Sequence, residues 1–198
     1  MKVLLMVDIQ NDFSPTGALA VKDGDEIIPF VNDQQDAFDF IVATQDWHPQ
    51  NHGSFAEHHP DKSPGEVITL GGIDQILWPA HCVQNTYGAE FIPGLNTEKI
   101  NQVFQKGMNP NIDSYSGFFD NDHKNATGLH QYLQAQKVND IYIVGLATDY
   151  CVKFTALDAA LLGYSTTVLK KGVRGVELAS GDIEQAFAEM QTAGVKID

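Results

Sequence analysis

Short, uninterrupted apolar runs recur along the chain, and polar residues follow each of them. The first run occupies residues 3–7 and ends at Asp8, and similar runs occupy 38–43 and 141–144. Runs of this length without apolar and polar alternation are typical of strands that are buried on both faces of a parallel sheet. Shorter runs at 103–104 and 166–169 predict two further strands.

Helical periodicity appears between these runs. Residues 149–162 are apolar nearly all round, which predicts a buried helix with Gly163 at its C-cap. Three other segments show one apolar face, and Gly194 can cap the last of them. These faces consist of Ile27, Val31 and Phe38; of Leu129, Tyr132 and Leu133; and of Ile183, Ala186, Phe187 and Met190. Strands that alternate with helices predict an α/β fold, a three-layer α/β/α sandwich around a mainly parallel sheet.

One long region, residues 47–96, breaks this alternation. It holds five of the seven histidines and five of the eight prolines. Segments longer than ~12–15 residues without regular structure are usually functional or disordered inside a compact domain. The aromatic and histidine content argues against disorder, so we expect an excursion that carries a metal and substrate site within one domain spanning residues 1–198.

Composition and charge narrow the classes of function. Apolar residues make up 43% of the 198 residues and charged residues 19%, as in ordinary globular proteins. The formal net charge of −14 would repel phosphate backbones and anionic lipid, so neither nucleic acid nor a membrane surface is an expected partner. No apolar run approaches the ~20 residues that a bilayer requires, and the N-terminus lacks a secretory signal pattern, so we expect a cytoplasmic protein. The two cysteines, Cys82 and Cys151, are expected to be reduced, with Cys82 in the core.

The ends of the predicted strands carry chemistry. Ligands of open parallel sheets bind outside the carboxyl ends of the strands, and there the chain places Asp8, Lys106 and Cys151. A thiol at a helix N-terminus beside a cation has a lowered pKa. With Lys106 as the cation and Asp8 as proton acceptor, Cys151 could form and hydrolyse a thioester. Taken alone, Cys151 is better explained as a small buried apolar residue.

A second group of polar residues follows the predicted strand at 38–43. Asp46 and His48 alternate along an extended segment, which places both side chains on one face. A carboxylate and an imidazole in this arrangement suit zinc, iron or manganese. The candidates for a third ligand are His52, His58, His59 and His81.

Six strings of residues resemble, in family order, the motifs of the nicotinamidases in the cysteine hydrolase (isochorismatase-like) superfamily. They are residues 7–13 (VDIQNDF), 45–49 (QDWHP), 78–82 (WPAHC), 106–107 (KG), 113–119 (DSYSGFF) and 145–152 (GLATDYCV). The first string alone is typical of the whole superfamily. The Asp-X-His pair together with Trp-Pro-X-His-Cys favours nicotinamidases, because the isochorismatase and carbamoyl-amidase relatives lack that metal site.

The resemblance implies a catalytic triad and a metal centre. The triad would be Asp8, Lys106 and Cys151. One divalent metal ion, expected to be zinc with iron or manganese as alternatives, would be held by Asp46, His48 and His81. A fourth protein ligand stays open among His52, Ser54 and Glu57.

The resemblance also implies a substrate pocket. Phe13 and Trp78 match aromatic residues that wall the pyridine ring, and Tyr150 matches another pocket position. The peptide that joins Leu146 to Ala147 matches one that is cis in the family. It would turn the backbone amides of Ala147 and Cys151 toward an oxyanion.

The implied activity is the hydrolysis of nicotinamide, and of pyrazinamide, to the acid and ammonia through a cysteine thioester, as part of NAD salvage. The metal would orient the ring nitrogen. Three alternatives remain open at this point: a metal-free relative acting on another amide, carbamoyl or enol-ether substrate, a non-haem iron oxygenase, and a catalytically silent binding module. The chain could be a monomer or a homo-oligomer.

Overall fold

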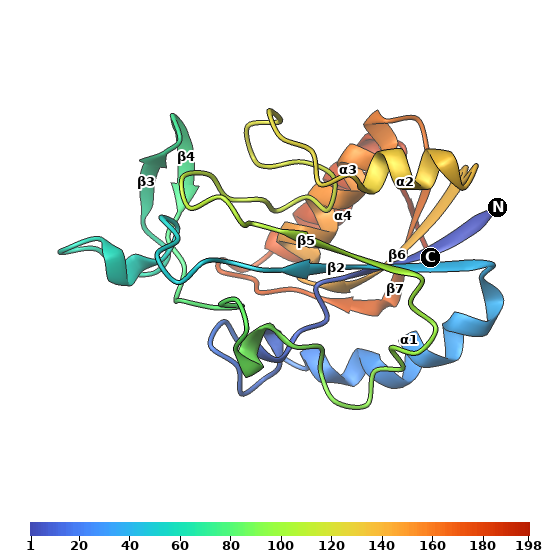
Figure 1. The fold of residues 1–198 in the computed structure, drawn as a ribbon, viewed down its shortest axis with the longest axis horizontal. Coiled ribbons are helices and arrows are strands. Elements are labelled where there is room, and N and C mark those ends of the chain that lie inside the picture. The colour runs from blue at the N-terminus through green and yellow to red at the C-terminus, as the bar shows by residue number, and fades with distance from the viewer.

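A six-stranded sheet, parallel throughout, runs through the middle of the protein (Figure 1). The computed structural model describes residues 1–198, and its strands lie in the order β5-β2-β1-β6-β7-β8. Their bounds are β1 Lys2–Val7, β2 Phe40–Asp46, β5 Gln102–Lys106, β6 Asp140–Leu146, β7 Ser165–Arg174 and β8 Lys196–Ile197. The continuous apolar run of β1 therefore occupies a central position between β2 and β6.

Side chains of β1 point alternately into two separate cores. Val3, Leu5 and Val7 belong to one apolar cluster, and Leu4 and Met6 belong to the other. All five are fully buried. Both faces of the sheet must therefore be covered, which explains why β1 shows no polar alternation.

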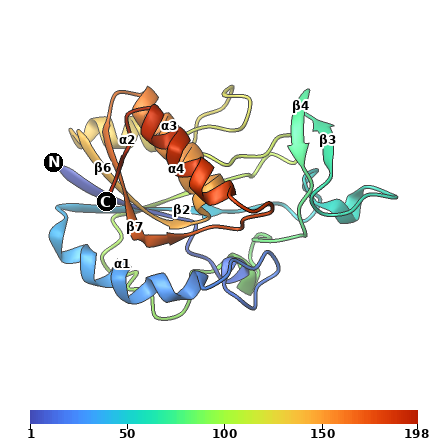
Figure 2. The ribbon, with the colours of Figure 1, turned by 180° about the vertical axis from the view of Figure 1, so that it is seen from behind.

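Helices provide this cover on both faces (Figure 2). Helix α1, Ile28–Gln34, packs on one face, and α2 Leu129–Ala135, α3 Lys153–Leu161 and α4 Asp182–Thr192 pack on the other. This arrangement confirms the predicted three-layer α/β/α fold. None of these helices combines the length and apolar character that crossing a bilayer requires.

Several boundaries differ from the predicted ones. Strand β2 begins at Phe40 and runs on to Asp46, because its last three residues pair with β5 although all three are polar. The predicted helix at 149–162 begins as a π-helical turn, Thr148–Val152, before α3. An apolar pattern cannot distinguish that turn from an α-helix. The two-residue strand β8 was not predicted.

The excursion between β2 and β5 contains an antiparallel hairpin, β3 Val67–Leu70 and β4 Ile73–Ile76, which was also not predicted. This hairpin stands away from the main sheet in both views (Figures 1 and 2). The rest of the excursion is held by isolated bridges, such as His48 with Val83 and Phe55 with Trp78. Short 3-10 turns lie at Asn11–Phe13, Gly24–Ile27, Gln35–Ala37, Ala56–His58 and Tyr87–Ala89.

A close contact between β1 and β6 fixes the strand end that precedes Asp8. Gly145 has φ +125°, and a Cβ atom there would lie 1.9 Å from the carbonyl oxygen of Val7. We expect Gly145→Ala to abolish or severely lower the yield of folded protein. Gly163→Ala is the matched control: its φ is +90° but its Cβ would meet open space.

The control should lose only ~1–2 kcal/mol of unfolding free energy, or about 2–8 °C in Tm. Thermal unfolding followed by circular dichroism measures both variants. Equal Tm values for Gly145→Ala and Gly163→Ala would show that the contact between β1 and β6 does not limit the fold.

Candidate active site

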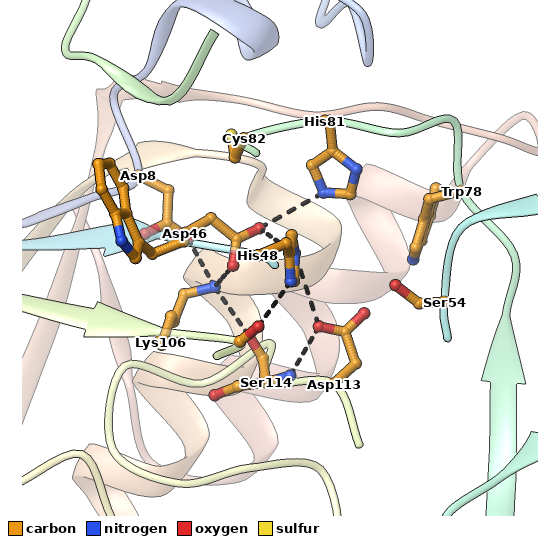
Figure 3. Close-up of polar contacts among 12 residues, drawn as sticks. Asp8, Asp46, His48, Ser54, Trp78, His81, Cys82, Lys106, Asp113 and Ser114 are labelled. Atoms are coloured by element: carbon orange, nitrogen blue, oxygen red, sulfur yellow. Dashed lines mark hydrogen bonds and ion pairs between the residues drawn. The ribbon is translucent and has the colours of Figure 1, made fainter. Parts of the chain in front are cut away.

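The carboxyl ends of the parallel strands bring polar side chains to one buried place, where Figure 3 shows Asp8, Asp46 and Lys106 close together. Asp8 follows β1, Asp46 ends β2 and Lys106 ends β5. Cys151 lies in the π-helical turn after β6. Each of the four residues is at most 6% exposed. The residues that the sequence placed at strand ends therefore do meet.

The Lys106 ammonium lies at the centre of this group. Its Nζ is 2.9 Å from Asp8 Oδ2, 3.0 Å from Asp46 Oδ1 and 3.5 Å from Cys151 Sγ. It also donates a hydrogen bond of 2.8 Å to the carbonyl oxygen of Ser114. Burial lowers the pKa of Lys106, but the carboxylates of Asp46 and Asp8 outweigh burial and hold that pKa well above its ordinary value. The ammonium therefore stays charged.

Asp8 and Cys151 are both shifted toward their neutral forms. Burial raises the pKa of Asp8 more than Lys106 lowers it, although Thr44 Oγ1 also donates a 2.6 Å hydrogen bond to Asp8 Oδ1. Burial likewise raises the pKa of the Cys151 thiol well above its ordinary value, and Lys106 opposes this only in part. The expectation of a lowered thiol pKa is wrong, because burial outweighs the nearby cation. The resting pair is a neutral thiol beside a carboxylate of raised pKa.

Asp46 also contacts two histidines with its second oxygen. Oδ2 lies 3.1 Å from His48 Nε2 and 3.4 Å from His81 Nε2. The Nδ1 atoms of the two rings lie 2.8 Å from the carbonyl oxygens of Gly107 and Pro79 respectively. A carbonyl oxygen can only accept, so both Nδ1 atoms carry hydrogen and both Nε2 atoms are directed at Asp46.

This group fits a divalent metal ion. The ligand atoms of Asp46, His48 and His81 lie within 4.8 Å of one another. His48 Nε2 is buried and makes no hydrogen bond, as expected of a nitrogen that binds a metal ion. Burial lowers the pKa of His48, but Asp46 outweighs burial and raises that pKa to about 9. The site therefore attracts positive charge, which a metal ion would supply. Three protein ligands leave further positions open.

Two residues lie close enough to His48 to be considered as a fourth metal ligand. His52 and Asp113 present ligand atoms within 4.8 Å of those of His48. His52 Nδ1 lies 2.7 Å from Ser54 Oγ, whereas His52 Nε2 is buried, makes no hydrogen bond and stays available as a ligand. The side chain of Glu57 is 56% exposed and faces solvent. Asp113, which lies 3.9 Å from His48 Nε2, had been assigned no role although it belongs to one of the six strings.

A cavity opens beside both groups. Its walls include the predicted pocket residues Phe13, Trp78 and Tyr150, together with Ala147 and Cys151. The Trp78 and Tyr150 ring centroids are 4.9 Å apart, and the rings meet nearly at right angles. The peptide from Leu146 to Ala147 is cis, as the resemblance implied. The thiol therefore faces a small cavity with aromatic walls.

Sequence reasoning missed several residues that hold this site. Gln10 is fully buried, and its side chain accepts from the backbone N–H of Asp46 and donates to the Asp46 carbonyl, both at 2.8 Å. Tyr115 lines the cavity, and its hydroxyl accepts a hydrogen bond from Trp78 Nε1. Both lie within the six strings, which was the available signal. Thr44, beside Asp8, lies outside them and carried no signal.

Known proteins that are similar to this chain identify its family. The family model described as the isochorismatase domain matches residues 2–197. The nicotinamidase of Escherichia coli (strain K12) is 46% identical over 202 residues, which cover 99% of this chain and 93% of that protein. The chain belongs to the nicotinamidase group of the isochorismatase family. It is therefore an amidohydrolase, and the recognition made from the six strings is confirmed.

Two solved structures of relatives share the fold. The yeast nicotinamidase bound to the inhibitor nicotinaldehyde is 36% identical, with a TM-score of 0.94, and the match covers 100% of this chain and 99% of that one. The pyrazinamidase of Pyrococcus horikoshii in complex with zinc is 40% identical, with a TM-score of 0.80, and the match covers 100% and 98%. Relatives of this fold therefore bind a small pyridine ligand and a zinc ion.

We expect Lys106→Met to destabilise the protein strongly, because it leaves Asp8 and Asp46 buried without their cation. Removing one partner of a buried ion pair costs about 3–5 kcal/mol of unfolding free energy. Lys99→Met is the control, since Lys99 pairs with Asp36 at the surface and such pairs contribute about 0–1 kcal/mol. Chemical denaturation at neutral pH measures both variants. A loss in Lys106→Met no larger than in Lys99→Met would contradict the central role of the ammonium.

Proposed function

We propose that this amidohydrolase converts nicotinamide to nicotinate and ammonia through a thioester on Cys151, using the whole chain, residues 1–198, as one catalytic domain. The observation that carries the proposal is the placement of the Lys106 ammonium. It contacts the Cys151 thiol and that thiol's proton acceptor, Asp8, and it also contacts Asp46, one of the candidate metal ligands. Cys151 and Asp46 both line the aromatic cavity.

A flat pyridine ring suits this cavity. Phe13 and Trp78 lie in its wall and would stack against the ring, with aromatic contacts worth about 0.5–1.5 kcal/mol beyond the buried area. Tyr150 would close a third side. Pyrazinamide presents the same carboxamide on a flat ring of similar size, so we propose that it is also a substrate.

Asp46, His48 and His81 would hold the metal, for which zinc is our first choice. When bound, the metal would supply a Lewis acid that orients the ring nitrogen. The protein fixes the ligands for this purpose: Gly107 and Pro79 hold the two imidazoles through Nδ1. Gln10 holds the backbone of Asp46.

In the first half of the reaction, Asp8 accepts the proton of Cys151, and the thiolate attacks the carboxamide carbon. The backbone N–H groups of Ala147 and Cys151 would stabilise the oxyanion. Asp8 returns the proton to the leaving nitrogen, and ammonia departs as the thioester forms. The raised pKa of Asp8 suits it to both tasks, because a group must bind and release the proton with similar ease.

In the second half, Asp8 takes a proton from a water molecule, which attacks the thioester carbon. The C–S bond breaks and the proton held by Asp8 returns to the Cys151 sulfur. The product leaves as nicotinic acid, which loses its carboxyl proton to solvent and becomes nicotinate. Lys106 contacts both groups throughout and stabilises whichever of them is negative. One carboxylate therefore serves as the acid and base of both halves.

Ammonia release from nicotinamide tests this function. The purified protein should release one ammonia per nicotinate, and Cys151→Ala should release none above background while still binding substrate. Cys82→Ala is the matched control, because Cys82 is a buried free thiol outside the cavity wall. A chelator should raise KM, and added zinc should restore it. Ammonia release by Cys151→Ala at the parent rate would overturn the thioester mechanism.

The acid limb of the kcat/KM profile tests the role of Asp8. Activity requires ionised Asp8, so kcat/KM should fall as the pH drops through the raised pKa of Asp8. Thr44→Val removes the hydroxyl that stabilises ionised Asp8. A hydrogen bond to a charged group contributes about 1.5–3 kcal/mol, so the limb should move up by about one pH unit or more. Thr44→Ser retains the hydroxyl and should leave the limb in place. An unmoved limb in Thr44→Val would contradict Asp8 as the base.

A further inference from the structure

One side chain of the β3–β4 hairpin reaches the wall of the active site. Gln75, in β4, is 2% exposed, whereas its neighbour Asp74 faces solvent. The hairpin makes no ladder pairs with the main sheet. A buried amide on an element so separate from the core requires partners of its own.

The partners of Gln75 belong to the site. Its Nε2 lies 3.0 Å from the hydroxyl oxygen of Tyr115 and 3.2 Å from Asp113 Oδ2, in addition to 2.7 Å from the carbonyl oxygen of Ile76. The hydroxyl oxygen of Tyr115 also accepts the indole N–H of Trp78, at 3.1 Å. Gln75 therefore joins the aromatic wall to a carboxylate.

That carboxylate lies beside the metal group. Asp113 Oδ1 accepts from the backbone N–H of Ser114 at 2.7 Å and lies 3.9 Å from His48 Nε2. Its Oδ2 has Gln75 as its side-chain donor. Without Gln75, the Asp113 carboxylate would keep the hydrogen bond at Oδ1 but lose the one at Oδ2. It could then rotate about its Cβ–Cγ bond.

The acceptor side of Gln75 strengthens the same network. Asn121 Nδ2 lies 3.4 Å from Gln75 Oε1, and Asn121 Oδ1 accepts the backbone N–H of Tyr115 at 2.9 Å. Tyr115 is thus held at its backbone and at its hydroxyl. Its ring lies 5.6 Å from that of Tyr150, so the indole of Trp78 sits in a frame of fixed aromatic neighbours.

We propose that Gln75 is a positioning residue for the reaction: its amide sets the orientation of Trp78 through Tyr115 and that of Asp113 directly, so that the hairpin controls ring binding and metal retention together. The substrate arm of this proposal rests on the proposed nicotinamidase function. The metal arm does not, because it depends only on the contact between Asp113 and the metal group.

Two variants separate the two arms. Gln75→Leu removes the donations to Tyr115 and Asp113, together with the local one to the Ile76 carbonyl, at similar volume. Tyr115→Phe removes only the oxygen that Trp78 and Gln75 share. Both should raise KM for nicotinamide about ten-fold, the equivalent of one hydrogen bond of about 1.4 kcal/mol, with kcat changed less than about three-fold. Only Gln75→Leu should also weaken zinc binding, by about ten-fold. Zinc affinity is measured on the purified full chain by competition with a chromophoric chelator.

The double variant and a surface control complete the design. Since both substitutions break one network, Gln75→Leu with Tyr115→Phe should raise KM no more than about two-fold above Gln75→Leu alone. Thr69→Ala, on the exposed side of the hairpin, should leave KM and zinc affinity at parent values. Additive KM effects would overturn the shared network.

Other outcomes are equally decisive. An unchanged KM in Tyr115→Phe would overturn the aromatic arm, even if Gln75→Leu failed to fold. An unchanged zinc affinity in folded Gln75→Leu would overturn the metal arm. If the parent protein did not hydrolyse nicotinamide, the proposed function would fail, and the zinc measurement would still decide whether Gln75 positions Asp113.

Discussion

The buried ammonium of Lys106 between the carboxylates of Asp8 and Asp46 is the contact on which the rest of the site depends. An isolated buried charge costs several kcal/mol, so none of the three groups would remain ionised at this depth alone. Each carboxylate has a second task. Asp8 faces the Cys151 thiol, and Asp46 turns its other oxygen toward His48. One cation therefore connects the groups for thiol chemistry with the groups for metal binding.

The parallel sheet explains why these side chains meet. Asp46 and Lys106 are register partners at the ends of β2 and β5. Strand β1 lies on the other side of β2 and delivers Asp8, and β6 lies beside β1 and leads into the turn that carries Cys151. The excursion then supplies His81 and Trp78 from residues that belong to no strand of the sheet. The sheet thus places the charges, and the excursion adds Trp78 to the substrate wall and His81 to the candidate metal ligands.

Much of this site was predictable, for physical reasons that also explain what was missed. Asp8, Lys106 and Cys151 follow apolar runs that mark buried strands, so their convergence follows from the topology of parallel sheets. Thr44 gave no signal, because its hydroxyl matters only through the distance to Asp8 that folding creates. The pKa of Cys151 was expected on the wrong side of its ordinary value, because sequence reveals the nearby cation and not the degree of burial. The predicted end of β2 was wrong because its last three residues are polar and nevertheless pair with β5.

The charge of Lys106 in the folded protein tests the central claim most directly. Side-chain carbon and nitrogen resonances of labelled lysine report protonation by NMR across a pH titration. The ammonium should remain protonated from pH ~6 to ~10, because Asp46 and Asp8 hold the pKa of Lys106 above the ordinary value of about 10.4. A neutral Lys106 amine within that range would contradict the account, since the two carboxylates would then lack the charge that stabilises them.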